Sequence, residues 1–495
     1  MSRLFALAIL CLLSISSGAQ KVFDFNSTCQ QAYLEITKLK LGVGQQLINE
    51  ARSQNSNNLI PYLLEGYIDF FVLFFNEDPN EYKQRKNNFN LRLDAFDEGS
   101  ETSPFYNYCR AITYIQRAAV EIKFGERLGA GLDFKKAFSL IKQNRRDFPG
   151  FMPNNMIYGP LQVVIGTVPK NYRWAANLFG LRGSISEGMN TMRTFLNSND
   201  QYARLFQNEA SFYYCYLKYY LENKPEEVFQ FINSRKLDLV NNHLFTYLAA
   251  NLGINNKQTD FARNVILRRN TSPEYLSTSV WDFEMGYAKL HHLEYQEAIN
   301  YFERFIRSFK GRFYVKDVLQ KISWAHYLLG NMPAAENARQ RLLQRGNTDT
   351  DADKKAQKDA KSNQWPNVIL LKARLLSDGG YHKEALSLLH GKSSASFSDP
   401  GHALEFDYRV ARIYDDLGND DAAITAYLAA IRLGENRKEY YAARAALQIG
   451  YIYEKRGNKA QAIAYFEKCI AMEDHEYKDS LDQRAKSGIA RCKGQ

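Results

Sequence analysis

The chain has 495 residues, of which 45% are hydrophobic and 24% charged, and its formal net charge is +10 at pH 7. Lysine and arginine are scattered among aspartate and glutamate, with no dense basic tract and no nucleic-acid-binding motif, so the positive charge does not predict binding to DNA or RNA. After the N-terminus, no apolar run reaches the roughly 20 residues of a membrane-spanning helix, so we expect no integral membrane segment.

Residues 1–19 have the pattern of a secretory signal peptide. Arg3 supplies a short basic region, an apolar run covers residues 4–13, and small residues lead to a cleavage site after Ala19. The chain has six cysteines, and removal of the signal peptide with Cys11 would leave five. These five do not have the spacing of a disulfide framework. The sequence therefore predicts an exported protein, in the periplasm or cell envelope of a bacterium, with the extracellular medium as an alternative.

Residues 20–272 are predicted to be helical but irregular. Helical periodicity of apolar residues is clear over 39–51, 59–75, 105–128 and 212–231. The last of these contains five tyrosines that are too dense for one helix face, so we expect part of the cluster to face a partner or a groove: Tyr213, Tyr214, Tyr216, Tyr219 and Tyr220. No run of alternating strands occurs, and the predicted fold is all-α.

Residues 273–476 contain a repeated pattern of two helices. Its units can be aligned by the alanine of the second helix, with spacings of 37, 50, 38 and 39 residues in chain order: Ala298, Ala335, the looser Ala385, Ala423 and Ala462. Self-similarity at such a period indicates a helical repeat array, in which each unit needs its neighbours to bury its apolar face.

The last two units define the packing most clearly. Gly418 and Gly457 end the first helix, because glycine adopts the left-handed conformation at little steric cost. Small and aromatic residues then recur at i, i+4 and i+7 on the second helix, where we expect them to be buried: Ala423, Tyr427 and Ala430, then Ala462, Phe466 and Cys469.

Two segments differ from the repeats. Residues from about 346 to 363 are polar and free of aromatic side chains until Trp365, and we predict a mobile surface loop there. Residues 477–495 carry an apolar stripe that predicts a capping helix: Leu481, Ala485, Ile489 and Cys492.

The C-terminal pattern resembles that of tetratricopeptide-repeat (TPR) proteins. The middle of the chain is more faintly similar to the inclusion-body-clearance family of TPR proteins, through Gly159-Pro160-Leu161, Val168-Pro169, Gly180-Leu181-Arg182-Gly183-Ser184 and Gly188-Met189. The resemblance implies a right-handed helical-repeat solenoid, preceded by an irregular helical half, with a concave groove that holds peptide segments of other proteins.

No catalytic or cofactor-binding pattern is present in the sequence. None of the eight histidines has the spacing of a zinc site. Asp349, Asp351 and Asp353 imitate a calcium loop, but Lys354 replaces its glycine and Ala360 its glutamate. We therefore expect no metal, no cofactor and no enzymatic activity.

The remaining candidate binding site lies on the first helix of each repeat unit. It is the helix face opposite the one that packs against the second helix, hereafter the stripe. It carries aromatic and charged residues suited to clamping an extended peptide, with an ordinary solvated face as the alternative: Phe283, Tyr287, Leu290, Tyr408, Arg412, Asp415, Leu447, Tyr451 and Glu454. We expect a scaffold that binds protein or peptide partners at the cell envelope, where peripheral association is compatible with the sequence. The alternative is a glycan- or nutrient-binding component of an envelope complex.

Overall fold

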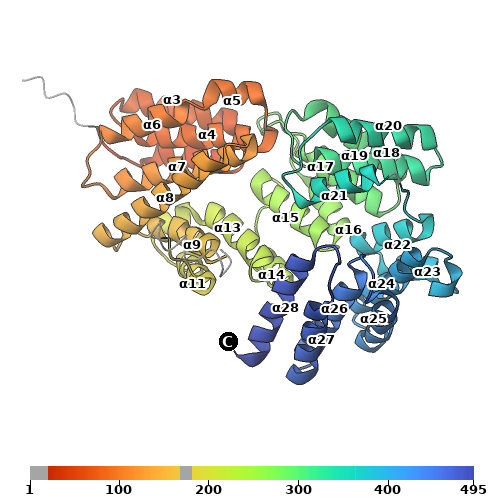
Figure 1. The fold of residues 1–495 in the computed structure, drawn as a ribbon. Helices are drawn as coiled ribbons and strands as arrows, with labels where there is room; N and C mark the ends of the chain where they lie inside the picture. The colour runs from red at the N-terminus through yellow and green to blue at the C-terminus, as the bar shows by residue number, and fades with distance from the viewer. Residues whose placement is uncertain (1–20, 168–180, 363, 495) are drawn as a thin grey trace, which may run out of the picture.

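The computed structural model describes residues 21–167, 181–362 and 364–494, so the predicted signal peptide lies outside it. The described residues form an all-α helical-repeat solenoid, as predicted (Figure 1). Between them they form no sheet, and a single isolated bridge joins Val22 to Asn58. Among the helices of this part of the chain, none combines the length and the apolar character needed to cross a membrane.

The N-terminal helices form a bundle, most of which packs around a large aromatic core (Figure 1). Their bounds are α2 Ser27–Thr37, α3 Leu41–Gln54, α4 Ile60–Asn76, α5 Pro79–Arg85, α6 Asn88–Asp97, α7 Pro104–Phe124, α8 Arg127–Asp147, α9 Pro153–Gly166, α11 Ile185–Leu196, α12 Gln201–Leu205, α13 Gln207–Tyr220 and α14 Pro225–Ser234.

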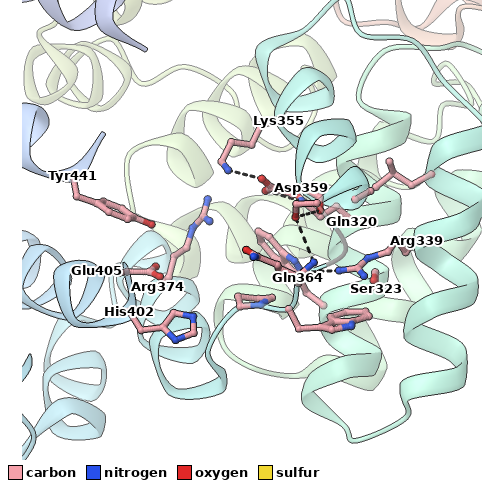
Figure 2. Close-up of a pocket in the computed structure, with 16 residues that line it drawn as sticks. Gln320, Ser323, Arg339, Lys355, Asp359, Gln364, Arg374, His402, Glu405 and Tyr441 are labelled. Atoms are coloured by element: carbon pink, nitrogen blue, oxygen red, sulfur yellow. Dashed lines mark hydrogen bonds and ion pairs between the residues drawn. The ribbon is translucent and has the colours of Figure 1, made fainter. Parts of the chain in front are cut away.

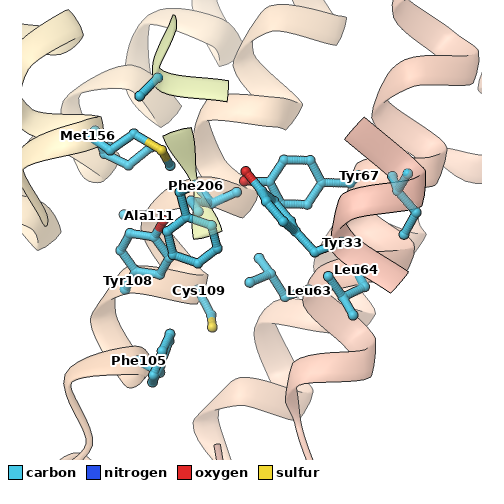
Figure 3. Close-up of a cluster of buried hydrophobic side chains, with 14 of the residues drawn as sticks. Tyr33, Leu63, Leu64, Tyr67, Phe105, Tyr108, Cys109, Ala111, Met156 and Phe206 are labelled. Atoms are coloured by element: carbon cyan, nitrogen blue, oxygen red, sulfur yellow. The ribbon is translucent and has the colours of Figure 1, made fainter. Parts of the chain in front are cut away.

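A buried carboxylate lies at the centre of this core. Figure 3 shows Tyr33 and Tyr67 turned toward one another, and both hydroxyls donate to Glu209, at 2.5 and 2.9 Å. Tyr213 donates to its other oxygen at 2.6 Å. Burial raises the pKa of Glu209, whereas the three hydroxyls favour its ionised form. The polar group is therefore satisfied within the core, and we assign it a structural role.

The glycines of the middle segment allow close helix packing. A Cβ atom on Gly188 would lie 2.5 Å from the backbone oxygen of Gly159, and one on Gly183 would lie 2.5 Å from that of Gln162. These residues therefore let α9 and α11 approach each other. Val168, Pro169 and Gly180 of the same motifs lie outside the described residues.

Within the described residues, six helix pairs share one geometry. They are α15 His243–Asn255 with α16 Thr259–Arg268, α17 Val280–His291 with α18 Tyr295–Ser308, α19 Val315–Leu328 with α20 Met332–Gln344, α22 Val368–Gly379 with α23 His382–Leu389, α24 Pro400–Asp416 with α25 Asp420–Gly434, and α26 Tyr441–Lys455 with α27 Lys459–Ala471.

The pairs have a common register. In each, a buried alanine of the second helix follows a small buried residue of the first by twelve positions: Ala250 and Ala262, Gly286 and Ala298, Ser323 and Ala335, Ala373 and Ala385, Ala411 and Ala423, Gly450 and Ala462. Five positions before that alanine, the backbone takes a positive φ at Lys257, Leu293, Gly330, Gly380, Gly418 and Gly457. The pair α15–α16 thus has repeat geometry, although it lies in the region predicted to be irregular.

Small residues allow the paired helices to approach each other. A Cβ atom on Gly450 would lie 2.5 Å from the ring of Phe466, and one on Gly286 would lie 2.5 Å from the ring of Phe302. Ser323, a departure from the pattern, donates its hydroxyl to the Ala335 oxygen at 2.8 Å. The buried set predicted for the second helices, from Ala423 to Cys469, is confirmed.

The polar segment is not a loop, and this prediction was wrong. Residues Asp351–Lys361 form helix α21, which packs against α19 and α20. Thr350 caps its N-terminus by accepting from the Asp353 N–H, while Ala356 and Ala360 face the core. Asp353 itself is buried and accepts from the N–H groups of Tyr314 at 2.8 Å and Asp317 at 3.0 Å. Of the three aspartates that imitate a calcium loop, Asp353 therefore has a structural role as a hydrogen-bond acceptor.

The C-terminal helix α28, Lys478–Lys493, packs against α26 and α27. It buries Leu481, Ala485 and Cys492. The short 3₁₀ helix η2, Ser394–Ser396, precedes α24.

Candidate binding site at the junction of the helical bundle and the repeats

A cavity of about 550 Å³, hereafter the aromatic cavity, lies where the N-terminal bundle meets the first repeat pairs. Helices α4, α7, α13, α15, α17, α18, α19 and α21 and their connections contribute its walls. Its lining is Phe74, Phe75, Glu77, Lys123, Tyr216, Tyr220, Tyr247, Asn251, Ile254, Asn255, Ser279, Val280, Phe283, Glu284, Tyr287, Phe305, Phe309, Phe313, Tyr314, Asp317 and Ala352.

The tyrosine-rich helix α13 divides its side chains between core and cavity. Tyr214 is buried and Tyr213 bonds to Glu209, so both belong to the core. Tyr216 and Tyr220 line the cavity with their rings stacked, at 6.1 Å between centroids and an interplanar angle of 13°. The density of tyrosines is thus explained by two different environments.

Aromatic side chains also remain exposed at the cavity. Tyr220 is 54% exposed and Tyr314 is 42% exposed. Phe283 packs against Tyr314 and two further rings, with centroids 5.7 Å from Tyr314, 5.0 Å from Tyr287 and 5.3 Å from Phe305. Exposed aromatic rings beside an apolar hollow are typical of binding surfaces.

One carboxylate lies deep among these rings. Glu284, on α17, is 1% exposed and accepts a hydrogen bond from Nδ2 of Asn251 at 2.8 Å. Tyr216 donates in turn to the Asn251 oxygen at 3.3 Å. Burial raises the pKa of Glu284 to about 7, and the bond from Asn251 opposes this only in part. A deeply buried group with a displaced pKa, in a cavity, is a candidate functional residue.

Two further acids of the cavity are held by lysines. Asp317 accepts from Lys321 at 2.8 Å and from the hydroxyl of Tyr287. Glu77 pairs with Lys123 at 2.7 Å and also accepts from the N–H of Arg312 at 3.4 Å. The second pair connects α4 and α7 of the bundle to the turn between α18 and α19.

The nine residues predicted as a groove do not form one surface. Phe283 and Tyr287 line the aromatic cavity. Three of the others are core residues, contrary to their assignment to the groove: Leu290 is fully buried, Tyr408 is 4% exposed and Leu447 is 1% exposed. They are covered because neighbouring helices pack over the stripe, as where Tyr441 of the next first helix contacts Tyr408 at 5.1 Å between ring centroids.

The other four predicted residues contact side chains of the same chain. Arg412 donates to Asp415 and to Asp416 at 3.4 Å, and Asp415 accepts from Tyr427 at 2.9 Å. Farther along the array, Arg491 of α28 pairs with Glu454 at 2.7 Å and lies over the ring of Tyr451. Whether any of these residues contacts a partner stays a prediction.

A second, smaller cavity of about 230 Å³ lies between α19–α21 and the later repeats. Figure 2 shows Lys355 directed to Asp359 and Arg339 directed to Gln364, and the pairs are 2.7 and 2.6 Å apart. Its polar side chains bond to one another, as Gln320 does to Asp359, or to neighbouring groups of the same chain, as Ser323 does to the Ala335 oxygen. It therefore offers a partner fewer free groups than the aromatic cavity does.

The sequence contained a signal for the missed cavity residues. Tyr247 and Asn251 of α15 stand at the stripe positions that Phe283 and Tyr287 occupy in α17, fifteen and eleven residues before the buried alanine. Recognising Ala250 and Ala262 as a further repeat pair would have placed them in the same stripe. Nothing in the sequence pattern distinguished Glu284.

Metal-binding groups are not gathered at either cavity. In residues 21–167, 181–362 and 364–494, no three histidine, cysteine or acidic side chains are placed to hold a metal ion. The five cysteines of this part are free and buried.

The TPR family model matches residues 408–436 and 443–475. No curated protein sequence matches the chain. Among solved structures, the TPR domain of P58(IPK) is 14% identical, covers 82% of this chain and 93% of its own, and has a TM-score of 0.23. The Cut9–Hcn1 hetero-tetramer of APC/C is 12% identical, covers 94% and 99%, and has a TM-score of 0.26.

The fainter resemblance to the inclusion-body-clearance family stays a prediction. The matched residues coincide with the helices α24 to α27, in which the repeat geometry is most regular. The chain therefore carries tetratricopeptide repeats over these residues.

Proposed function

We propose that this protein is an exported, non-enzymatic TPR scaffold that binds a segment of a partner protein at the cell envelope, and that the aromatic cavity holds part of this segment. TPR scaffolds are built for protein–protein interaction, and one observation carries the finer assignment. The cavity joins the bundle to the repeats and presents the exposed rings of Tyr220 and Tyr314.

The composition of the cavity favours a partner side chain over a solvent-filled gap. Aromatic residues dominate the energetics of protein interfaces, because their large rigid faces bury apolar area with little loss of conformational entropy. A volume of about 550 Å³ also lies within the usual range of ligand pockets.

Export and envelope association are supported by the pattern of residues 1–19 and by the absence of a disulfide framework in the sequence. Cell fractionation with N-terminal sequencing tests them. We expect a mature chain that begins at Gln20 in the periplasmic or envelope fraction. An unprocessed chain in the cytosol would contradict the proposal.

Binding is tested by affinity capture from the envelope fraction with the wild type and three variants. Tyr220→Ser and Tyr314→Ser change the rim of the cavity. Tyr477→Ser is the matched control, since Tyr477 is 45% exposed and, like Tyr314, precedes a helix with a positive φ. We expect the rim variants alone to lose a specific protein. Retention of the same proteins by all four chains would contradict the cavity assignment.

A glycan is the second candidate, because the stacked rings of Tyr216 and Tyr220 and the amides of Asn251 and Asn255 would suit a saccharide. A glycan array distinguishes the two functions. Binding of an oligosaccharide that Tyr220→Ser abolishes, without capture of a protein, would favour the glycan.

A further inference from the structure

Within the part of the chain that the structure describes, Glu284 has no cationic partner, although it is the least exposed acid of the aromatic cavity. Asn251 donates to its Oε1 at 2.8 Å. Among the described residues, no hydrogen bond reaches Oε2 and no lysine, arginine or histidine forms an ion pair with this carboxylate. The neighbouring acids differ in this respect, since Lys321 holds Asp317 and Lys123 holds Glu77.

This arrangement is unfavourable for the free protein. An ionised carboxylate that is taken out of water without a cation loses its hydration and receives no compensating charge. Burial accordingly raises the pKa of Glu284. A cation that entered the cavity would supply the missing charge and favour the ionised form.

The walls of the cavity also favour a cation. Tyr216, Tyr247 and Tyr287 line the cavity together with Glu284 and lie near enough to interact with its charge, and the face of an aromatic ring attracts an ammonium or guanidinium group. The chain already uses this contact at the cavity, where Nζ of Lys123 lies 4.8 Å from the ring centroids of Phe74 and Phe313.

The hydrogen bonding at Glu284 favours lysine over arginine. Asn251 occupies Oε1, which leaves one oxygen without a donor. An ammonium is a compact donor that one oxygen can hold, whereas the planar guanidinium is matched to both oxygens of a carboxylate. The aliphatic stem of lysine would also cover apolar wall while its charge reaches inward.

We propose that the aromatic cavity receives the ammonium group of a lysine side chain from the partner segment, held by Glu284 and the surrounding tyrosine rings. This inference rests on the proposed function, because it names the anchor residue of the segment that the cavity binds.

The experiment uses a bead-bound library of random short peptides and the whole purified protein. We expect the wild type to retain peptides enriched in lysine, and soluble copies of them to bind about tenfold more weakly when that lysine is acetylated or replaced by norleucine. Glu284→Gln should retain peptides of the same apolar character without the preference for lysine. Asp282→Asn is the matched control on the same helix, because Asp282 pairs with Arg304 at the surface, and it should behave as the wild type.

The outcomes separate this inference from the proposed function. Three results would overturn the lysine anchor and leave peptide binding intact. The retained peptides could lack lysine enrichment, or they could be enriched in arginine instead. Acetylation could also weaken binding to Glu284→Gln as much as to the wild type. If no retained peptide is lost on Tyr220→Ser, both are overturned. Circular dichroism of each variant establishes that a loss of binding is not a loss of folding.

Discussion

At the scale of single residues, small side chains decide how closely the paired helices pack. Gly450 faces Phe466 so closely that an added Cβ atom would lie 2.5 Å from the ring. Interiors are packed as densely as organic crystals, so the ring cannot move away without disturbing its neighbours.

We therefore predict that Gly450→Ala destabilises the protein by about 1–3 kcal/mol, in spite of the better helix propensity of alanine. Gly131→Ala is the control, since Gly131 lies in helix α8 with nothing within 4 Å of an added Cβ. Thermal unfolding should show a lower Tm for the first variant and an equal or higher Tm for the second. Equal Tm values would contradict this account of the packing.

Glu284 makes stability depend on pH. Burial raises its pKa from the ordinary 4.5 to about 7, so the folded chain holds the proton more tightly than the unfolded chain does. The stabilising contribution is therefore complete below pH 4.5 and is lost as the pH rises toward 7, and the difference amounts to about 3 kcal/mol.

We predict that Glu284→Gln removes this dependence. Denaturant unfolding of the two proteins should show the wild type losing stability relative to the variant between pH 5 and 8, by an amount on the order of 3 kcal/mol. Parallel pH profiles would mean that Glu284 is solvated.

At the scale of elements, the sequence predicts the repeat units that keep the usual residue types, but not those in which other residues take these positions. The last two units were clear because glycine, alanine and aromatic residues occupy the positions that packing restricts most, as at Gly457, Ala462 and Phe466. The pair α15–α16 was missed because Lys257 takes the left-handed position usually held by glycine. Ile266 likewise occupies its aromatic position.

Helix α21 was missed because its main anchor to the neighbouring helix is polar. Apolar periodicity detects helices that bury hydrophobic stripes, whereas Asp353 docks α21 by accepting backbone N–H groups of Tyr314 and Asp317. The candidate site was also only partly predictable. The sequence pattern places Tyr408 on the stripe, but it does not show that the next first helix packs over this residue.

We predict that Asp353→Ala loosens α21, because it leaves the N–H groups of Tyr314 and Asp317 without this acceptor, at a cost of about 1–3 kcal/mol for the buried N–H of Asp317. Hydrogen exchange should accelerate over residues 351–361 and in the turn before α19. Asp351→Ala is the control, since that side chain is 96% exposed. Similar exchange in the two variants would show that Asp353 is not an anchor.

At the scale of the whole molecule, the bundle and the repeats meet at Glu77, the buried acid of a partly buried ion pair in the bundle. Glu77 is 3% exposed and pairs with Lys123, and it also accepts the Arg312 N–H. This contact fixes the turn from which Phe313 and Tyr314 reach the aromatic cavity. The cavity therefore depends on the junction.

We predict that Lys123→Met destabilises the junction by about 3–5 kcal/mol, because it leaves Glu77 buried without its cation. Limited proteolysis should then cut near residues 309–314. Lys224→Met removes a lysine that is 53% exposed from a surface pair with Glu227 and should change stability by less than about 1 kcal/mol. Equal resistance of both variants to proteolysis would argue against the junction.

The central claim is that a partner segment occupies the aromatic cavity, and site-specific photo-crosslinking in the native cells tests it most directly. A photoreactive phenylalanine analogue replaces Tyr314 in one strain and Tyr477 in another, at sites that are 42% and 45% exposed and share a positive φ. The account predicts a crosslinked envelope protein from position 314, through a segment that contains lysine, and none from position 477. The same crosslinks at both positions, or none at 314, would contradict it.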